Sequence, residues 1–250
     1  MSKWLQQHTP TPLRKLYRVG QRWQFQLRSL LSSSHRAASG TTTADLADAS
    51  TRAANPFATH IPILIGLAYL YEVRRILEFG CGNYSTRLFL DRRIFPNLEQ
   101  LLSYENEHDW HKKFAATLQN DERANLCYVH GSMASVVASV PFDEYQLVFI
   151  DDSGVIPERV KTIRQVLAHR STQNIVIIHD FQTGDYYNAT TNTQHRYVFD
   201  ALNPYTGIVW WDAPISISSL GRINKLVAAH MNLLDLDDIE GWKRVFSRAT

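Results

Sequence analysis

The stretch RILEFGCGNYST, residues 75–86, decides the expected fold of this chain. A short apolar run ends in two glycines one residue apart, Gly80 and Gly82, and a polar turn then leads into apolar residues 88–90. This order predicts a strand, a tight loop and a helix, with glycines where the backbone turns sharply and approaches a ligand. The first N–H groups of such a helix have no partner within the helix and can bind a polar ligand. The loop therefore indicates a site for a nucleotide-like cofactor.

The composition is that of an ordinary globular protein. Of the 250 residues, 44% are hydrophobic and 20% charged, which is enough for one full-sized α/β domain. The formal net charge of +2 argues against a nucleic-acid-binding surface over the whole chain. The two cysteines, Cys81 and Cys127, exclude a disulfide framework and fit a reducing compartment, so we expect a cytoplasmic location. No apolar run reaches the roughly 20 residues that cross a bilayer.

The amino-terminal region differs from the rest of the chain. Residues 1–40 contain lysine and arginine but no acidic residue, and residues 13–31 place apolar side chains at mostly helical spacing beside a stripe of arginines. Such a helix either packs on its own domain or a second subunit, or lies peripherally on an anionic membrane. Residues 32–55 are rich in Ser, Thr and Ala and are typical of a linker. We therefore expect a basic helical extension with its linker over residues 1–55 and an α/β domain over residues 56–250.

The domain shows alternating strand and helix patterns. Strands are predicted at 75–79, 101–105, 126–130, 145–151, 174–179, 207–211 and 215–220. Helices are predicted at 61–72, from 85 onward, and at 109–118, 160–169 and 194–202. Repeated units of this length predict a doubly wound, mostly parallel sheet of about seven strands flanked by helices. The last two strands are close enough to form an antiparallel pair at one sheet edge.

Small or ionisable residues follow each of the first five predicted strands. They are Gly80-Cys81-Gly82, Glu105, Gly131-Ser132, Asp151-Asp152 and His179-Asp180. Ligands of doubly wound sheets bind outside the carboxyl ends of the strands. We therefore expect these residues to gather around one binding site.

The glycine loop and Glu105 bear on the choice of cofactor. A carboxylate at the end of the second strand can accept hydrogen bonds from both hydroxyls of a ribose, in a nicotinamide dinucleotide as in other nucleosides. The dinucleotide fingerprint, however, needs a third glycine where Ser85 stands. Glu78, two residues before Gly80, either binds a cationic group or positions the loop.

Residues 56–220 resemble the class I S-adenosylmethionine-dependent methyltransferases. The resemblance is carried by Glu78-Phe79-Gly80-Cys81-Gly82, by Glu105, by Phe149-Ile150-Asp151-Asp152 and by His179-Asp180. It implies S-adenosyl-L-methionine as cofactor, with the glycine loop against the methionine part, Glu105 on the ribose and Ser132 near the adenine. The resemblance also implies that Asp151 binds the cofactor. Many members have a third glycine where Tyr84 stands, so the contacts of Asn83, Ser85 and Thr86 stay open.

The residues after the fourth and fifth strands are candidates for catalysis. Methyl transfer from a sulfonium is an in-line displacement that needs an aligned acceptor, and an oxygen acceptor also has to lose its proton. His179 is the candidate base because its ordinary pKa is near neutral, with Asp151 or Asp180 orienting it. The alternatives for His179 are a structural hydrogen bond at the strand end and acceptor binding.

A metal ion is a separate question. Catechol O-methyltransferase-like enzymes bind magnesium through an Asp after the fourth strand and Asp-Asn after the fifth. Asp151 and Asp180 match the first two of these ligands, but Phe181 stands where the Asn should be. Two carboxylates with water could still hold magnesium, yet the departure favours a site without metal.

The acceptor is expected to contact Asp152, His60 and two tyrosines, Tyr186 and Tyr187, in a polar lid over residues 182–194. The His-Asp end of the fifth strand also resembles polysaccharide and sugar O-methyltransferases, which ranks a small or carbohydrate-like hydroxyl first and an amine second. A synthase that transfers the aminopropyl or aminocarboxypropyl group, a non-catalytic scaffold, and a nucleotide-sugar or nicotinamide enzyme are the alternatives. The oligomeric state does not follow from the sequence.

Overall fold

The computed structural model describes residues 55–247. The expected amino-terminal helix, including residues 13–31, and the linker lie outside the described residues. The strands are β1 (Arg75–Phe79), β2 (Gln100–Glu105), β3 (Ala124–Tyr128), β4 (Leu147–Ile150), β5 (Ile175–His179), β6 (His195–Phe199) and β7 (Thr206–Trp210). The α-helices are α4 (Ile61–Leu70), α5 (Ser85–Leu90), α6 (His108–Leu118), α7 (Ile156–His169), α8 (Gly184–Ala189), α9 (Ile217–His230) and α10 (Ile239–Ser247). Three 3-10 turns, η1 (Met133–Ser135), η2 (Val137–Ser139) and η3 (Phe142–Glu144), precede β4.

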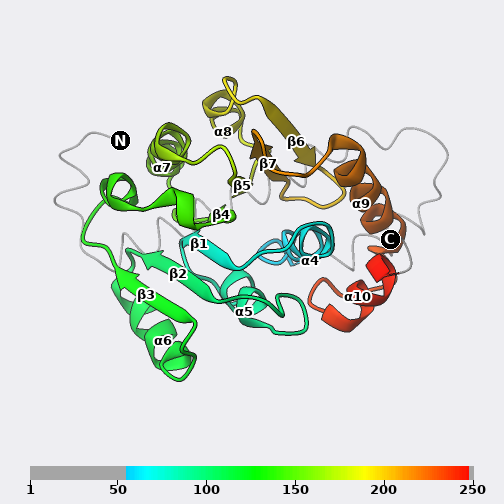
Figure 1. Cartoon of the computed structure of the whole chain (residues 1–250), viewed down its shortest axis with the longest axis horizontal. Coiled ribbons are helices and arrows are strands. Elements are labelled where there is room, and N and C mark those ends of the chain that lie inside the picture. The colour runs from blue at the N-terminus through cyan, green and yellow to red at the C-terminus, as the bar shows by residue number, and fades with distance from the viewer. Residues whose placement is uncertain (1–54, 248–250) are drawn as a thin grey trace, which may run out of the picture. The chain divides into compact units, whose positions relative to one another are not determined.

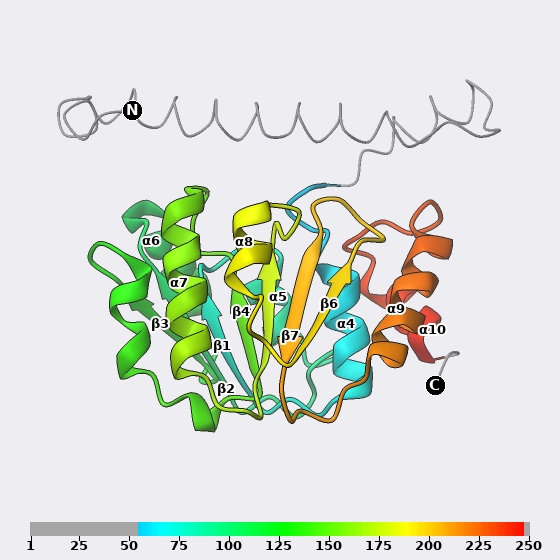
Figure 2. The same cartoon turned by 90° about the horizontal axis from the view of Figure 1, so that it is seen from above.

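The strands form one seven-stranded sheet in the order β3-β2-β1-β4-β5-β7-β6 (Figures 1 and 2). Neighbouring strands from β3 to β5 are parallel, and β7 is antiparallel to both β5 and β6. Every residue of β4 and β5 is buried, as expected for central strands that are covered on both faces. The predicted doubly wound sheet with an antiparallel pair at one edge is confirmed.

Two apolar layers cover the sheet because successive side chains of a strand point to opposite faces. In β4, Leu147 and Phe149 pack in one layer, together with residues of α4, α5, α9 and α10. Val148 and Ile150 pack in the other layer, with residues of α7 and α8. Figure 1 shows α7 and α8 on one side of the sheet and α4 and α5 on the other. The loops at the carboxyl ends of the strands are thereby fixed between two packed layers.

Two predicted elements near the carboxyl terminus were wrong. Residues 194–202, expected as a helix, contain β6, whose His195–Phe199 segment is rich in the aromatic and β-branched residues that favour strands. Residues 215–220, expected as a strand, lead into α9, which Ser216 caps by accepting the Ser219 N–H at 3.1 Å. The antiparallel pair is therefore β6 with β7. The helix α10 was not predicted.

Among the described residues, none of the helices combines the length and the apolar character that a bilayer crossing requires.

Candidate functional site

Hydrogen bonds to the buried carboxylate of Glu78 position the loop after β1. Glu78 is fully buried in β1 and accepts hydrogen bonds from Ser85 Oγ (2.6 Å), Thr86 Oγ1 (2.9 Å) and Ser103 Oγ (2.5 Å). Thr86 Oγ1 in turn accepts the Gly82 N–H at 2.8 Å. Burial raises the pKa of Glu78 to about 7, although the three hydroxyl groups oppose the shift. Of the two roles expected for Glu78, the geometry supports the positioning of the loop.

Gly80 brings this loop against the end of β4. Its φ of +90° is a left-handed conformation that favours glycine. A Cβ built on Gly80 would lie 2.5 Å from the carbonyl oxygen of Asp151, so the two backbones leave no room for a side chain. The Gly80 N–H also donates to the carbonyl oxygen of Tyr104 in β2 at 2.8 Å. The loop is therefore fixed between the ends of β2 and β4.

Glu105, at the end of β2, lies beside the same loop. Its Oε1 accepts the Glu107 N–H at 2.7 Å, and its Oε2 lies 3.5 Å from Cys81 Sγ. Burial raises the pKa of Glu105 and also that of the Cys81 thiol. Because a carboxylate can accept about four hydrogen bonds, Glu105 keeps capacity for a ligand.

Asn83 and Ser132 lie at the edges of the candidate cofactor site. Lys113 Nζ of α6 lies 3.4 Å from Asn83 Oδ1, and Trp110 Nε1 donates to the Cys81 carbonyl at 2.6 Å, so α6 packs along the glycine loop. Ser132, after β3, donates from Oγ to Glu158 Oε2 at 3.2 Å. Both side chains are partly exposed.

The ends of β4 and β5 carry a network of charges around Arg159 of α7. Its guanidinium is buried and donates from Nη2 to Asp151 Oδ1 (2.7 Å) and from Nη1 to Asp180 Oδ2 (3.0 Å). The second oxygens of the two carboxylates face His179 Nδ1, at 3.4 Å for Asp151 Oδ2 and 3.7 Å for Asp180 Oδ1. Asp180 has a φ of +61°, which is uncommon outside glycine and is typical of constrained functional sites.

His179 has a hydrogen-bond partner at Nε2 and faces two carboxylates at Nδ1. Thr59 Oγ1 donates to the Pro204 carbonyl (2.9 Å) and lies 3.0 Å from His179 Nε2, so this hydroxyl oxygen accepts a hydrogen bond from the Nε2–H group. Burial lowers the pKa of His179, but the charges of Asp180 and Asp151 outweigh burial and the net pKa is raised. Burial likewise opposes ionisation of Asp151, yet Arg159 and His179 keep the pKa of that carboxyl well below its usual range.

Not all expected acceptor contacts face an accessible surface. Asp152 is turned inward, with Oδ2 accepting Thr162 Oγ1 at 2.7 Å and burial raising its pKa. Tyr186 is buried in α8 against Arg159, whereas Tyr187 is exposed and stacks under Arg196. The expected lid, residues 182–194, is therefore largely occupied by helix α8 and its turns.

His60 lies next to His179, with ring centroids 4.7 Å apart. The imidazole is buried, and neither ring nitrogen has a hydrogen-bond partner among the described residues. Burial, followed by the charge of His179, lowers the pKa of His60 to about 3, so the ring is neutral. A neutral imidazole with two unpaired nitrogens at this edge can accept or donate a hydrogen bond to a ligand.

Sequence reasoning missed the residues that connect these groups. Arg159 precedes the predicted helix at 160–169 by one residue, and an arginine in that place usually lies on the surface. Thr59 and Ser103 carried no pattern of their own, because their roles arise from contacts across the fold. The Asp151-to-Arg159 spacing was the one available signal, since a helix that follows β4 returns its first turn to the strand end.

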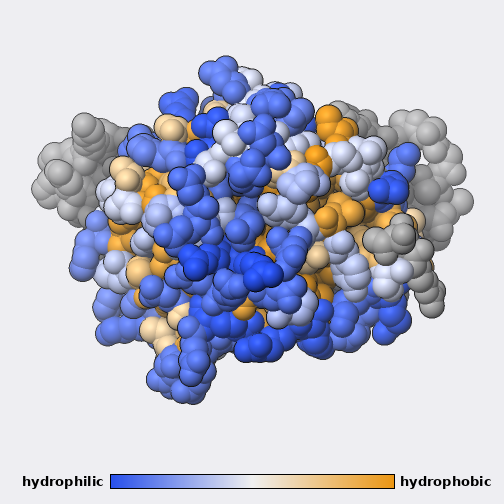
Figure 3. Space-filling model, in the orientation of Figure 1, coloured by the Kyte–Doolittle hydropathy of each residue, from blue (hydrophilic) through white to orange (hydrophobic). Residues whose placement is uncertain are grey.

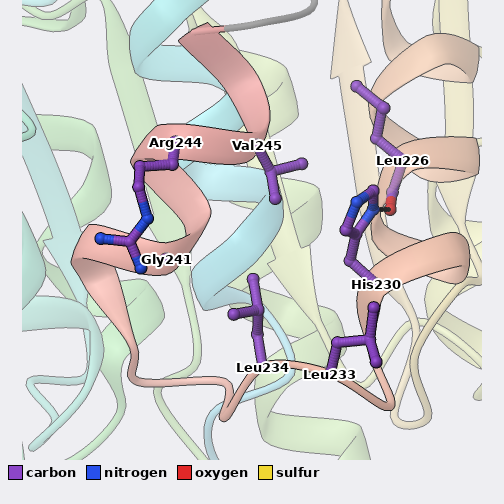
Figure 4. Close-up of a pocket in the computed structure, with 7 residues that line it drawn as sticks. All are labelled: Leu226, His230, Leu233, Leu234, Gly241, Arg244 and Val245. Carbon is purple, nitrogen blue, oxygen red and sulfur yellow. Dashed lines mark hydrogen bonds between the residues drawn. The ribbon is translucent and has the colours of Figure 1, made fainter.

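Two cavities lie away from the strand ends. One, of about 320 Å³, is lined by apolar residues of α9, of α10 and of the segment between them, with His230 and Arg244 at its sides (Figure 4). The other, of about 200 Å³, lies between α4, α9 and α10. In Figure 3 hydrophobic residues are scattered among hydrophilic ones over several parts of this face, including the part near α9. We place the candidate functional site at the strand ends, because the ionisable side chains converge there and not at these cavities.

The solved structures that are similar to this chain have little of its sequence. No family model and no curated protein matches the chain. An SAH-bound methyltransferase from Podospora anserina is 13% identical, with 75% of this chain and 95% of that chain covered and a TM-score of 0.49. A methyltransferase from Geobacter sulfurreducens is 7% identical (74% and 96%, TM-score 0.46), and a spermidine synthase complex with AdoDATO is 13% identical (65% and 60%, TM-score 0.45).

The observed sheet, in which β7 alone is reversed, is the doubly wound, mostly parallel sheet that the sequence predicted. At these identities and TM-scores, neither a cofactor nor an acceptor follows from the solved structures.

Proposed function

We propose that this chain is an S-adenosylmethionine-dependent methyltransferase that acts on an oxygen, or on a nitrogen, of a small-molecule or carbohydrate-like acceptor. One observation carries the proposal. The left-handed Gly80 packs the glycine loop against the β4 backbone, and Glu105 lies beside the same loop, 3.5 Å from Cys81 Sγ. A nucleoside with a cationic sulfonium fits this arrangement, with its ribose on Glu105 and its methionine part along residues 80–83.

The acceptor belongs on the far side of the loop, near the ends of β4 and β5. The Asp151 and Asp180 side chains are 30% and 29% exposed there, whereas the His179 side chain is 3% exposed. His179 is a poor candidate for the base, because Thr59 occupies Nε2 and two carboxylates face Nδ1. We assign it a positioning role, with the carboxylate pair and Tyr187 facing the acceptor.

Transfer of a labelled methyl group tests this function. The full chain, incubated with methyl-labelled S-adenosylmethionine and size-fractionated cell extract, should label a small-molecule or glycan fraction. Glu105→Gln should reduce this labelling at limiting cofactor by about 10-fold or more, because it weakens charge-assisted contacts to the ribose. Glu122→Gln, an exposed change, is the matched control.

The label position separates this proposal from its rivals. If the label on the aminocarboxypropyl carbons moved to product and the methyl label did not, the chain would be a synthase. Labelling equal to that of a no-enzyme control across all fractions, with the folded protein, would contradict catalysis.

A further inference from the structure

A groove between α9 and α10 lies away from the residues of the proposed methyl transfer. Its larger cavity, of about 320 Å³, extends from Leu226 and His230 of α9 to Arg244 and Val245 of α10. The second cavity, of about 200 Å³, lies between α4, α9 and α10. Leu226 lines both cavities, so they adjoin along α9.

The packing of the two helices explains why a groove remains between them. Trp242 of α10 is fully buried in the core, and α9 packs so closely on α4 that a Cβ on Gly66 would lie 2.9 Å from the Ile223 side chain. Each helix is therefore fixed to the core through one face. Leu226 and Val245 lie beside those faces and are only half-buried. Apolar surface between the helices is thereby left open.

The lining of the larger cavity is mostly apolar and partly exposed to solvent. Leu233 is 73% exposed, and Leu234 is half-buried like Leu226 and Val245. Figure 4 shows His230 and Val245 on opposite sides of the space between α9 and α10, with Leu234 on the segment that joins the helices. Exposed apolar surface that is contiguous commonly marks a binding site, and pockets for small molecules begin at about 300 Å³. An aliphatic group therefore fits this cavity.

The charged groups that line the groove are all cationic. Arg244 lines the larger cavity and Arg222 the second, and within residues 55–247 no aspartate or glutamate lines either one. Glu240, one turn before Arg244 in α10, is paired with Arg93 and Lys243 instead. Because neither guanidinium of the groove has a carboxylate partner in the described part of the chain, charge complementarity favours an anionic group here.

The same charges argue against a second copy of the chain as the occupant. In a symmetric dimer the same surface patch of both copies meets, so pairing through this groove would bring arginines of like charge together. A small amphiphile avoids this repulsion. Its aliphatic chain would cover Leu226 and Val245, while its anionic end would lie at Arg244.

We propose that the groove between α9 and α10 binds an amphiphile with one aliphatic chain and an anionic head group. The chain lies on Leu226, Leu234 and Val245, and Arg244 binds the head group. Burial of the chain drives binding, and the guanidinium selects an anion over a cation of the same chain length. A fatty acid and an alkyl phosphate share this chemistry.

Equilibrium dialysis of the full chain against labelled dodecanoate tests the site. We expect one dodecanoate bound per chain, with a dissociation constant of about 1–100 μM. Dodecyltrimethylammonium, which has the same chain and a cationic head, should bind about 10-fold or more weakly. Dodecyl phosphate should displace dodecanoate, and its relative affinity shows which head group the site prefers.

Variants locate the bound chain and its head group. Leu226→Gln should weaken dodecanoate binding by about 10-fold or more, because it places an amide in the wall of both cavities. Val245→Trp, which fills the larger cavity, should do the same. Arg244→Gln should weaken dodecanoate binding by about 5-fold or more without weakening that of dodecyltrimethylammonium. Leu167→Gln and Arg164→Gln, at a half-buried and an exposed position of α7, are the matched controls.

Melting temperatures report whether each variant is folded. Absence of saturable binding up to about 1 mM dodecanoate, equal affinity for the cationic amphiphile, or affinity unchanged by both Leu226→Gln and Val245→Trp would each overturn the site.

Sedimentation velocity and phosphatidylglycerol vesicles test the other occupants. Without dodecanoate binding, a dimer that Leu226→Gln dissociates would show that a second copy covers the groove. Vesicle binding that the same variant abolishes, again without dodecanoate binding, would show that a lipid surface covers it. Either result would contradict the proposal, and both would leave the proposed methyl transfer untouched.

Discussion

Glu78 shows how a single buried carboxylate shapes the candidate site. Its two oxygens accept hydrogen bonds from hydroxyl groups of α5 and β2. One of these hydroxyl groups, that of Thr86, also accepts the Gly82 N–H, so the same contacts fix the glycine loop. An acid with so little solvent contact is costly unless it is hydrogen-bonded or neutral. The loop geometry therefore depends on a buried carboxyl group whose pKa is raised to about 7.

This carboxyl should make stability depend on pH. Its pKa rises from 4.5 in the unfolded chain to about 7 in the fold, so folding takes up a proton between these values. The free energy of unfolding should fall as pH rises from 4.5 to 7, by up to about 3 kcal/mol from this group. In Glu78→Gln that part of the pH dependence should vanish. Urea unfolding at several pH values measures it, with Glu122→Gln as control; parallel curves for Glu78→Gln and the native chain would refute the assignment.

For single residues, the sequence predicted where the candidate site residues lie in the fold better than it predicted which residues they contact. Glu105, Asp151 and His179 lie at the strand ends where the sequence placed them, and Glu78 lies in β1 just before the glycine loop. Their partners were not predictable, because Ser103 reaches Glu78 through the β1–β2 register and Thr59 reaches His179 across 120 residues of sequence. Whether these residues bind cofactor or acceptor stays a prediction.

Among the elements, the loop between β1 and α5 depends on a glycine both for its backbone angle and for its close packing. Gly80 and Gly131 both have left-handed backbones, with φ of +90° and +95°. A Cβ on Gly80 would meet the Asp151 backbone at 2.5 Å, whereas a Cβ on Gly131 would meet nothing within 4 Å. Substitutions at the two positions therefore distinguish the cost of backbone strain, which both would have, from the cost of close packing, which only Gly80 would have.

Alanine at these two glycines should have different costs. Gly131→Ala should lose about 1–2 kcal/mol of stability from backbone strain alone. Gly80→Ala should lose about 2–3 kcal/mol more, because β1 and β4 must also separate. Denaturant unfolding of both variants gives the difference, and equal losses would show that the β1 loop is not packed against β4 as described.

Element types were predictable where the pattern was long or fully apolar. The buried runs of β1, β4 and β5 left no alternative to central strands. Residues 215–220 misled because Ile-Ser-Ile-Ser alternates like a strand over four residues, while the helical spacing of Leu220, Ile223 and Val227 extends beyond that window. Residues 194–202 misled because a short, half-buried edge strand carries a weak pattern.

For the whole molecule, the order of the strands in the sheet places the candidate site residues next to one another. Because β1 lies between β2 and β4, the glycine loop stands next to both Glu105 and Asp151, and β5 adds His179 and Asp180. Parallel strands end on the same side, so this convergence follows from the fold class and was predictable. The Arg159 contacts were not, because they depend on how α7 packs on the sheet.

The central claim is that a sulfonium nucleoside binds at the glycine loop and Glu105. Calorimetry of the full chain with S-adenosylhomocysteine, and with NAD for comparison, tests it most directly. We predict one S-adenosylhomocysteine bound per chain, no measurable heat with NAD, and an affinity about 10-fold or more lower in Glu105→Gln than in Glu122→Gln. Preference for NAD, or an affinity unchanged by Glu105→Gln, would contradict the claim.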